Sequence, residues 1–170
     1  MRVEPGVADH LRALTARITT FDREIGQHAQ SNDAAQRVAA LTGIGPITAS
    51  TIVATVGNAS DYRNGRQFAA CLGIVPRQFS SGGKTRLGRI TKRGDAYLRT
   101  LLIQGARSTM QAALRRPPTQ RDRISAWIVQ LAQRVGYHKA LVAIANKHAR
   151  IVWALLARGE TFDRKHCGAC

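Results

Sequence analysis

Two adjacent serines, Ser80 and Ser81, precede two glycines in the stretch VPRQFSSGGKTRLGRITKRGD, residues 75–95. A serine hydroxyl can attack a phosphodiester when a base or metal removes its proton and cations surround the charge that develops. Between residues 77 and 99, seven Lys and Arg stand against one acid, Asp95. Ser-Ser-Gly-Gly is also typical of a flexible linker or of a turn that grips phosphate. The stretch alone leaves both interpretations open.

The cations of this segment are the candidate phosphate ligands. The whole chain carries 26 Lys and Arg against 10 Asp and Glu, a formal net charge of +16. So large an excess indicates a polyanionic partner, with nucleic acid first and an anionic membrane second. An aromatic content of 5% argues against base stacking as the main mode of recognition. The candidates are Arg77, Lys84, Arg86, Arg89, Lys92, Arg93 and Arg99.

A site that would activate the serine has no counterpart in the sequence. The acids are scattered singly, and the histidines never pair at ligand spacing on one helix face. The terminal HCGAC, with His166, Cys167 and Cys170, offers one CxxC, whereas a closed zinc site needs four ligands. We therefore expect no metal and no cofactor to be bound by this chain, and a tail with incidental thiols.

The stretch TGIGP, residues 42–46, lies between two apolar segments and resembles the turn of a helix-hairpin-helix element over about 35–57. Glycines there let backbone N–H groups and the next helix N-terminus approach a phosphate. Pro46 suits the first helical turn. A purely structural helical hairpin is the alternative. The candidate contacts are Gly43, Gly45 and Thr48.

The N-terminal segment has a heptad pattern that predicts a helix over residues 5–30. We interpret residues 1–31 as a coiled-coil-like arm that joins copies of the chain, or joins it to a full-length relative, through residues 7–28. An amphipathic helix lying on its own domain is the alternative. Asn32 or Asp33 is suited to cap the next helix. The seam consists of Val7, Leu11, Leu14, Ile18, Phe21, Ile25 and His28.

The remaining pattern predicts an all-α fold. A short helix over 66–72 ends at Gly73, and a long basic Gly/Ser loop follows over 74–94, with at most a small ribbon over 85–91. Helices are expected over 95–116, 122–134 and 137–157, with Gly105 marking a close helix contact. The domain then covers 32–160 and a tail covers 161–170. Without a membrane-length apolar run or a signal peptide, a cytoplasmic protein with no membrane partner is expected.

Several motifs in order closely resemble the C-terminal half of transposases of insertion-sequence family 110, particularly its 1111 branch. The resemblance covers residues 33–159, and the arm is similar to the helical linker that precedes this domain in the family. The motifs are LTGIGPITASTIVATVG, FAACLGIVPRQFSSGGKTRLGRITKRGDAYLRTLLIQGA and HKALVAIANKHARIVWALL.

The resemblance implies a serine recombinase guided by a non-coding RNA, which assembles as dimers and tetramers through the linker and links DNA to a serine. Ser81, just before glycine, matches the family's nucleophile, with Ser80 the weaker candidate. The family's Asp-Glu-Asp-Asp carboxylates hold magnesium in an N-terminal RuvC-like domain, which has no counterpart here. Magnesium is thus expected only with that domain, and the setting implied is the bacterial nucleoid.

Three functions follow as expectations. In the first, the chain is the C-terminal portion of such a transposase, binds DNA and guide RNA backbones, and supplies Ser81 for strand cleavage and transfer. In the second, it is an inactive truncated remnant that binds nucleic acid and titrates the full-length enzyme through its arm. A ribosomal-type RNA-binding protein is the third, disfavoured because such a protein needs no heptad arm combined with a glycine hairpin.

Overall fold

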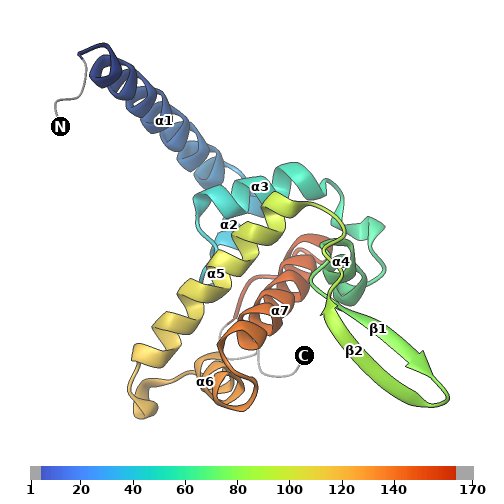
Figure 1. Cartoon of the computed structure of the whole chain (residues 1–170). Coiled ribbons are helices and arrows are strands. Elements are labelled where there is room, and N and C mark those ends of the chain that lie inside the picture. Colours follow the sequence, from blue (N-terminus) through green and yellow to red (C-terminus); the bar gives the residue numbers. More distant parts are fainter. Residues whose placement is uncertain (1–4, 164–170) are drawn as a thin grey trace.

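Helix α7 (Tyr137–Ala157) lies at the centre of the fold in the computed structural model, which describes residues 5–163. It packs against α4 (Gly65–Cys71), α5 (Ala96–Arg115) and α6 (Arg123–Val135) (Figure 1). Two short 3-10 turns, Ala59–Asp61 and Pro118–Gln120, complete the connections. The prediction of a mostly helical fold is confirmed, and the ranges expected for the last three helices agree within one or two residues.

The apolar face of α7 forms the middle of the hydrophobic core. By length and composition, α7 is also the one helix among residues 5–163 that could span a membrane. Its packing on α2, α4, α5 and α6 accounts for that apolar character, and 44% of its most apolar stretch is buried in the fold. The largest fully buried side chains of the core include Phe68, Leu98, Leu102, Met110, Ile128 and Ile144.

Helices α2 (Asp33–Ala39) and α3 (Pro46–Val56) pack against each other across a tight turn. Asn32 caps α2 as predicted, since its side chain accepts a hydrogen bond of 3.0 Å from the Ala35 N–H. Pro46 occupies the first turn of α3, also as predicted. Two helices joined by a turn are therefore present at the position where the sequence predicts them.

The turn between α2 and α3 is pressed against the middle of α5. A Cβ on Gly43 or on Gly105 would collide with the carbonyl oxygen of the other glycine. Thr109 donates a hydrogen bond of 2.9 Å from its hydroxyl to the Thr42 carbonyl. The close contact expected at Gly105 is confirmed, and its partner is this turn.

Helix α1 (Pro5–Ser31) projects from the domain as a single helix of 27 residues (Figure 1). Only its C-terminal turns touch the core: Ala29 is buried, and His28 Nδ1 lies 3.0 Å from Ser50 Oγ of α3. The seam is exposed along most of its length, with Leu11 at 55% and Ile18 at 59%. The predicted helix is confirmed, and it does not lie on its own domain.

The segment 74–94 was predicted to be a long loop with at most a small ribbon over 85–91. Most of it is instead a two-stranded antiparallel β-hairpin that projects from the other side of the core (Figure 1). Its strands are β1 (Pro76–Ser81) and β2 (Lys84–Ile90). Gly82 and Gly83 form a two-residue turn with φ of 57° and 76°. Positive φ at both central residues matches the right-handed twist of paired strands, which is why Gly-Gly favours a hairpin over an irregular loop here.

Candidate nucleic-acid interface

The hairpin register separates the two candidate serines. Ser81 pairs with Lys84 and Phe79 pairs with Arg86, whereas Ser80 pairs with Thr85. Because side chains alternate between the faces of a strand, Ser81, Lys84, Phe79 and Arg86 share one face and Ser80 lies on the other. The hairpin therefore has one basic face, and Ser81 belongs to it.

The environments of the two hydroxyls differ accordingly. Ser80 Oγ accepts a hydrogen bond of 2.8 Å from the Gln78 side-chain amide on its own face. Ser81 is exposed at the end of β1, next to the glycine turn. Both positions remain predictions as nucleophiles, but only Ser81 is placed beside cations.

The cations of the hairpin are exposed. Ion pairs join Arg12 with Asp9, Arg116 with Asp122 and Arg158 with Glu160, all of them outside the hairpin. The strands contain four Lys and Arg and no Asp or Glu: Arg77, Lys84, Arg86 and Arg89. A ribbon with this composition is suited to follow a phosphate backbone.

The base of the hairpin is tightly packed against the end of α4. A Cβ on Gly73 would collide with the Arg93 backbone, and one on Gly94 with the Cys71 carbonyl. Lys92 adopts a φ of 56°, which is uncommon for a residue with a side chain, and its N–H donates to the Gly73 carbonyl at 3.1 Å. These contacts fix the direction in which the hairpin leaves the core.

Arg99 belongs to this base rather than to the open ribbon. Its guanidinium donates hydrogen bonds to the Leu72 and Arg93 carbonyls at 3.3 and 3.2 Å. The side chain thereby ties the start of α5 to both ends of the segment that carries the hairpin. Its predicted contact with phosphate stays a prediction.

The structure does not bring the residues of the predicted helix-hairpin-helix to one exposed surface. Gly45 is exposed at the N-terminus of α3, with open space where a Cβ would stand. The backbone of Gly43 packs directly against α5, where a side chain would collide. Thr48 is only 8% exposed. Of these three candidates, Gly45 is the one whose backbone faces solvent.

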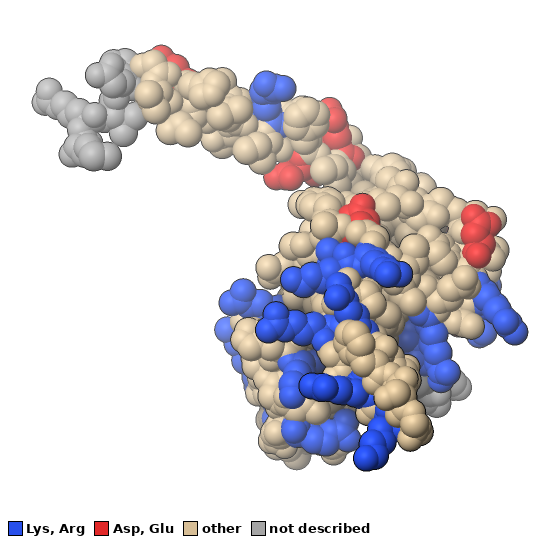
Figure 2. Space-filling view, turned by 45° about the vertical axis from the view of Figure 1, so that its right-hand side comes forward, with Lys and Arg blue, Asp and Glu red and all other residues tan. Residues whose placement is uncertain are grey.

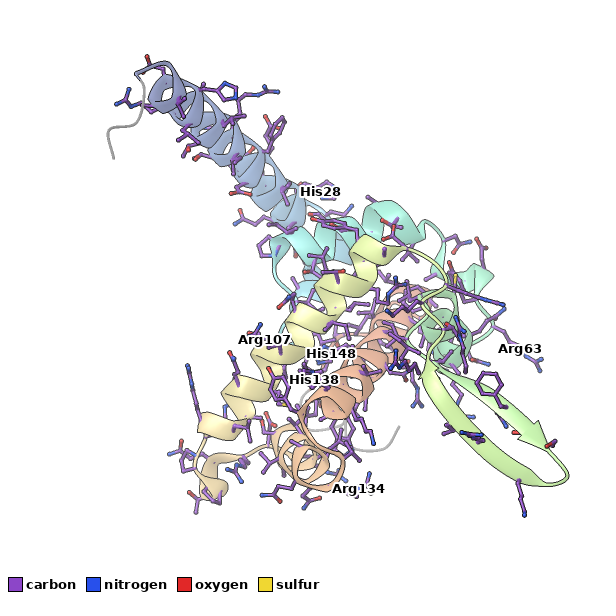
Figure 3. All side chains as sticks on the ribbon, in the orientation of Figure 1. His28, Arg63, Arg107, Arg134, His138 and His148 are labelled. Carbon is purple, nitrogen blue, oxygen red and sulfur yellow. The ribbon has the colours of Figure 1, made fainter. Side chains whose placement is uncertain are left out.

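A second basic region extends along the chain from the middle of α5 to the start of α7. It contains seven Lys and Arg with a single acid, Asp122, and the sequence analysis did not single it out. Figure 3 shows Arg107 and Arg134 on the outside of α5 and α6. At a rise of about 1.5 Å per residue, Arg107 lies about 17 Å and Arg115 about 28 Å along α5 from its first residue, Ala96. The second region consists of Arg107, Arg115, Arg116, Arg121, Arg123, Arg134 and Lys139.

A buried histidine lies beneath this second region, between α5 and α7 (Figure 3). His148 is 3% exposed, and its Nδ1 is buried without a hydrogen-bond partner. Burial, with a smaller contribution from the charge of Lys147, lowers its pKa to about 4. It lines a small cavity of about 20 Å³ together with Thr109, Ser125 and Arg116.

No donor set for the magnesium that the resemblance implies is found in the part of the chain that the structure describes. Within residues 5–163, no group of three or more His, Cys, Asp or Glu lies close enough to hold a metal ion. The hairpin contributes only cations and neutral side chains around Ser81. These residues do not fit magnesium, and no step on this chain is derived through it. His166, Cys167 and Cys170 lie outside the described residues.

Sequence reasoning missed two features of the site. One was the extent of the hairpin: the sequence predicted at most a small ribbon over 85–91, although Gly-Gly between two short runs is a hairpin signal, and the strands cover 76–81 and 84–90. The other was Phe79, which lies on the basic face and is 61% exposed. The signal that could identify Phe79 is an aromatic residue among cations on one strand, and this signal depends on recognising the strand first.

The chain matches the Transposase IS116/IS110/IS902 family over residues 35–124, which is more than half of its length. It therefore belongs to that family of transposases. The match begins in α2, includes the whole hairpin and α5, and ends at the start of α6.

Individual relatives extend the similarity to nearly the whole chain. A probable family 20 transposase of Pseudomonas aeruginosa is 50% identical over 150 residues, covering 88% of this chain and 43% of the relative. The transposase for insertion sequence element IS1111A of Coxiella burnetii is 44% identical, over 89% of this chain and 40% of the relative. That for IS1328 of Yersinia enterocolitica is 39% identical, over 91% and 45%. The chain thus spans less than half the length of these relatives.

Proposed function

We propose that this chain is the DNA-binding, nucleophile-bearing C-terminal portion of an insertion-sequence transposase. Its hairpin lies along a DNA backbone and presents Ser81 to a phosphodiester. The observation that carries the proposal is the register of the hairpin, which places Ser81 on the same face as Lys84 and Arg86. Family membership supplies the class of reaction, which is DNA transposition.

The reaction proposed for Ser81 is attack of its hydroxyl oxygen on the phosphorus. A bond forms between Oγ and phosphorus, the bond from phosphorus to one strand oxygen breaks, and that oxygen leaves with a proton as a free hydroxyl. Charge that develops on the phosphate oxygens is stabilised by Lys84, directly opposite Ser81, and by Arg86, one pair further along the same face. Strand transfer is the reverse attack by another strand hydroxyl on the phosphoserine.

The acceptor of the Ser81 proton comes from outside the hairpin in this proposal. Lys84 and Arg86 are cationic and Phe79 cannot accept a proton, so the face that carries Ser81 offers no base. Activation is expected only when a metal-bearing, RuvC-like domain is present. The chain alone then binds nucleic acid without cleaving it.

Two further parts of the proposal concern partners. The second basic region, which begins about 17 Å along α5 from its first residue, is suited to hold a second polyanion, and we assign the guide RNA to it. The exposed seam of α1 is suited to pack along another copy of the same helix, as in a coiled coil. That second helix belongs either to another molecule of this protein or to a full-length transposase.

Ser81→Ala tests the nucleophile, with Ser80→Ala as the matched control on the opposite face. Each variant is mixed with labelled transposon-end DNA, guide RNA and a full-length relative whose own serine is replaced. We expect Ser80→Ala to form the covalent protein–DNA adduct on denaturing gels and Ser81→Ala to form none, with equal DNA affinity. An undiminished adduct from Ser81→Ala would disprove the assignment.

The alternative function is an inactive remnant that titrates the full-length enzyme, and the exposed seam of α1 favours it. In that case neither serine variant changes anything. Replacing Leu14, Ile18 and Phe21 by Ser would instead abolish inhibition of transposition by the full-length enzyme. The two functions therefore respond to different variants.

A further inference from the structure

We propose that Phe79 stacks on an unpaired base of the DNA strand, directly beside the phosphodiester that Ser81 engages. This inference rests on the proposed function and names the form of DNA that the site takes, a strand whose bases are locally unstacked. Phe79 would then hold the nucleotide in place while Ser81 faces its phosphate.

The exposure of Phe79 is the first observation. Its side chain is 61% exposed on a ribbon that is itself solvated on both faces. The ring rests across the neighbouring strand because Gly88 leaves the space: a Cβ there would stand 3.1 Å from ring carbon Cε2. The ring is thus supported by backbone and still open to a ligand.

The surroundings of the ring are the second observation. Phe79 lines an open groove of about 470 Å³ with Arg77, Gln78, Thr91 and Arg93. Arg77 is oriented by a 3.5 Å hydrogen bond to the Thr91 carbonyl. A groove with an aromatic wall and two guanidinium groups suits a nucleotide, whose base has a π-face and whose phosphate is anionic.

The spacing to Ser81 is the third observation. Phe79 and Ser81 are two residues apart on the same strand and face, about 7 Å along the strand. That separation is comparable to the distance between successive nucleotides in an extended single strand. A base on Phe79, opposite Arg86, therefore places an adjacent phosphate at Ser81, opposite Lys84.

The chemistry favours an unpaired base over an intact duplex. In a duplex each base is already stacked on its neighbours, so its face is not available to a side chain. The phosphate contacts made by the cations are available in both forms. Loss of the ring should therefore weaken binding of single strands selectively.

Leu87 provides a matched control for this test. It is 62% exposed, nearly the same as Phe79, and pairs with Gln78 on the opposite face of the hairpin. Phe79→Ala and Leu87→Ala remove similar exposed apolar side chains from the same ribbon. Affinities are measured by fluorescence anisotropy for a fluorescein-labelled single strand and for the same strand annealed to its complement.

We expect Phe79→Ala to weaken single-strand binding about tenfold and duplex binding less than twofold, with an unchanged salt slope. Leu87→Ala should change neither by more than about twofold. Phe79→Trp should keep single-strand affinity and show tryptophan quenching on binding. Equal effects of Phe79→Ala and Leu87→Ala, or an equal loss for both DNA forms, would overturn the stacking role.

The two proposals fail in distinguishable ways. If wild-type binding depends steeply on salt and Ser81 forms the adduct, a nonselective Phe79→Ala result refutes stacking alone. If wild-type protein binds neither form in a salt-dependent way, the proposed function itself fails. A selective loss together with a missing adduct would support stacking and refute the nucleophile.

Discussion

Two elements project from the same helical core, and they differ in what they expose. Helix α1 has three cations and three acids along 27 residues, and a row of exposed apolar side chains. The hairpin has four cations, no acid, and one large exposed apolar side chain on each face, Phe79 and Leu87. Figure 2 shows the contrast: Lys and Arg gather over the body of the domain and are sparse on the arm. The two exposed surfaces therefore differ in chemistry, which is why we propose a protein partner for the arm and a polyanion for the hairpin.

The largest effect on DNA affinity is expected when the cations of the hairpin are removed, in comparison with removal of the cations of α1. Replacing Arg77, Lys84, Arg86 and Arg89 by Gln should weaken duplex DNA binding about 1000-fold at about 0.1 M salt, because each cation neutralises one phosphate. The slope of log affinity against log salt should fall by about 3.6. Anisotropy titrations at several salt concentrations measure both.

The matched control lies on the arm. Replacing Arg12, Arg17 and Arg23 by Gln removes nearly as much positive charge from α1 as the first set removes from the hairpin. We nevertheless expect the affinity for duplex DNA to change less than about tenfold. Equal losses from the two sets of variants would mean that overall charge, and not the hairpin, binds DNA.

Acidification should weaken the core that both projections share. His148 is held neutral, with a folded pKa of about 4 against 6.5 when unfolded, so the unfolded chain binds a proton that the folded chain does not. The stability that neutral His148 contributes is fully present above pH 6.5. As the pH falls to about 4, this contribution is lost, and the free energy of unfolding decreases by about 3 kcal/mol. Urea unfolding followed by circular dichroism at a series of pH values measures this loss.

His148→Gln removes the titrating group at similar size. Protonation of Asp and Glu in the same pH range affects both proteins, so the difference between them isolates the histidine. A wild-type curve parallel to that of His148→Gln would show that His148 is not protonated preferentially on unfolding.

A single substitution in the arm should have the smallest effect of the three. Leu14→Ala removes apolar surface twice in a pair of arms and should raise the dissociation constant of the oligomer about 100-fold, with no change in the salt slope of DNA binding. Sedimentation equilibrium measures the constant. Ala16→Ser, on the opposite side of the helix, is the control, and a monomeric wild-type protein would contradict the assignment.

The arm and the core helices were predictable because their signals are local. The heptad spacing from Val7 to His28 and the apolar repeat of α7 specify helices without knowledge of tertiary contacts. The hairpin lacks such a signal: β1 and β2 are exposed on both faces, so neither shows an apolar–polar alternation. Its only local mark was Gly82-Gly83.

The site was predictable in composition but not in geometry. The run of cations was evident from the sequence, whereas the face shared by Ser81 and Lys84 depends on strand register. Likewise, the close packing of Gly43 against α5 could not be seen in the sequence, and its predicted phosphate contact stays a prediction. That packing includes Thr109, which bonds to a carbonyl 67 residues earlier in the chain.

The two-residue turn at the hairpin tip also limits how this segment can change in length. Side chains alternate with a period of two, so inserting one residue into β1 would move Ser81 to the face now held by Ser80. Adding one residue to β1 and one to β2, both next to the turn, would leave the existing strand pairs unchanged. The turn would then lie further from the core. Insertions that preserve the chemistry at the tip therefore come in pairs, and odd-numbered ones exchange the roles of two neighbouring hydroxyls.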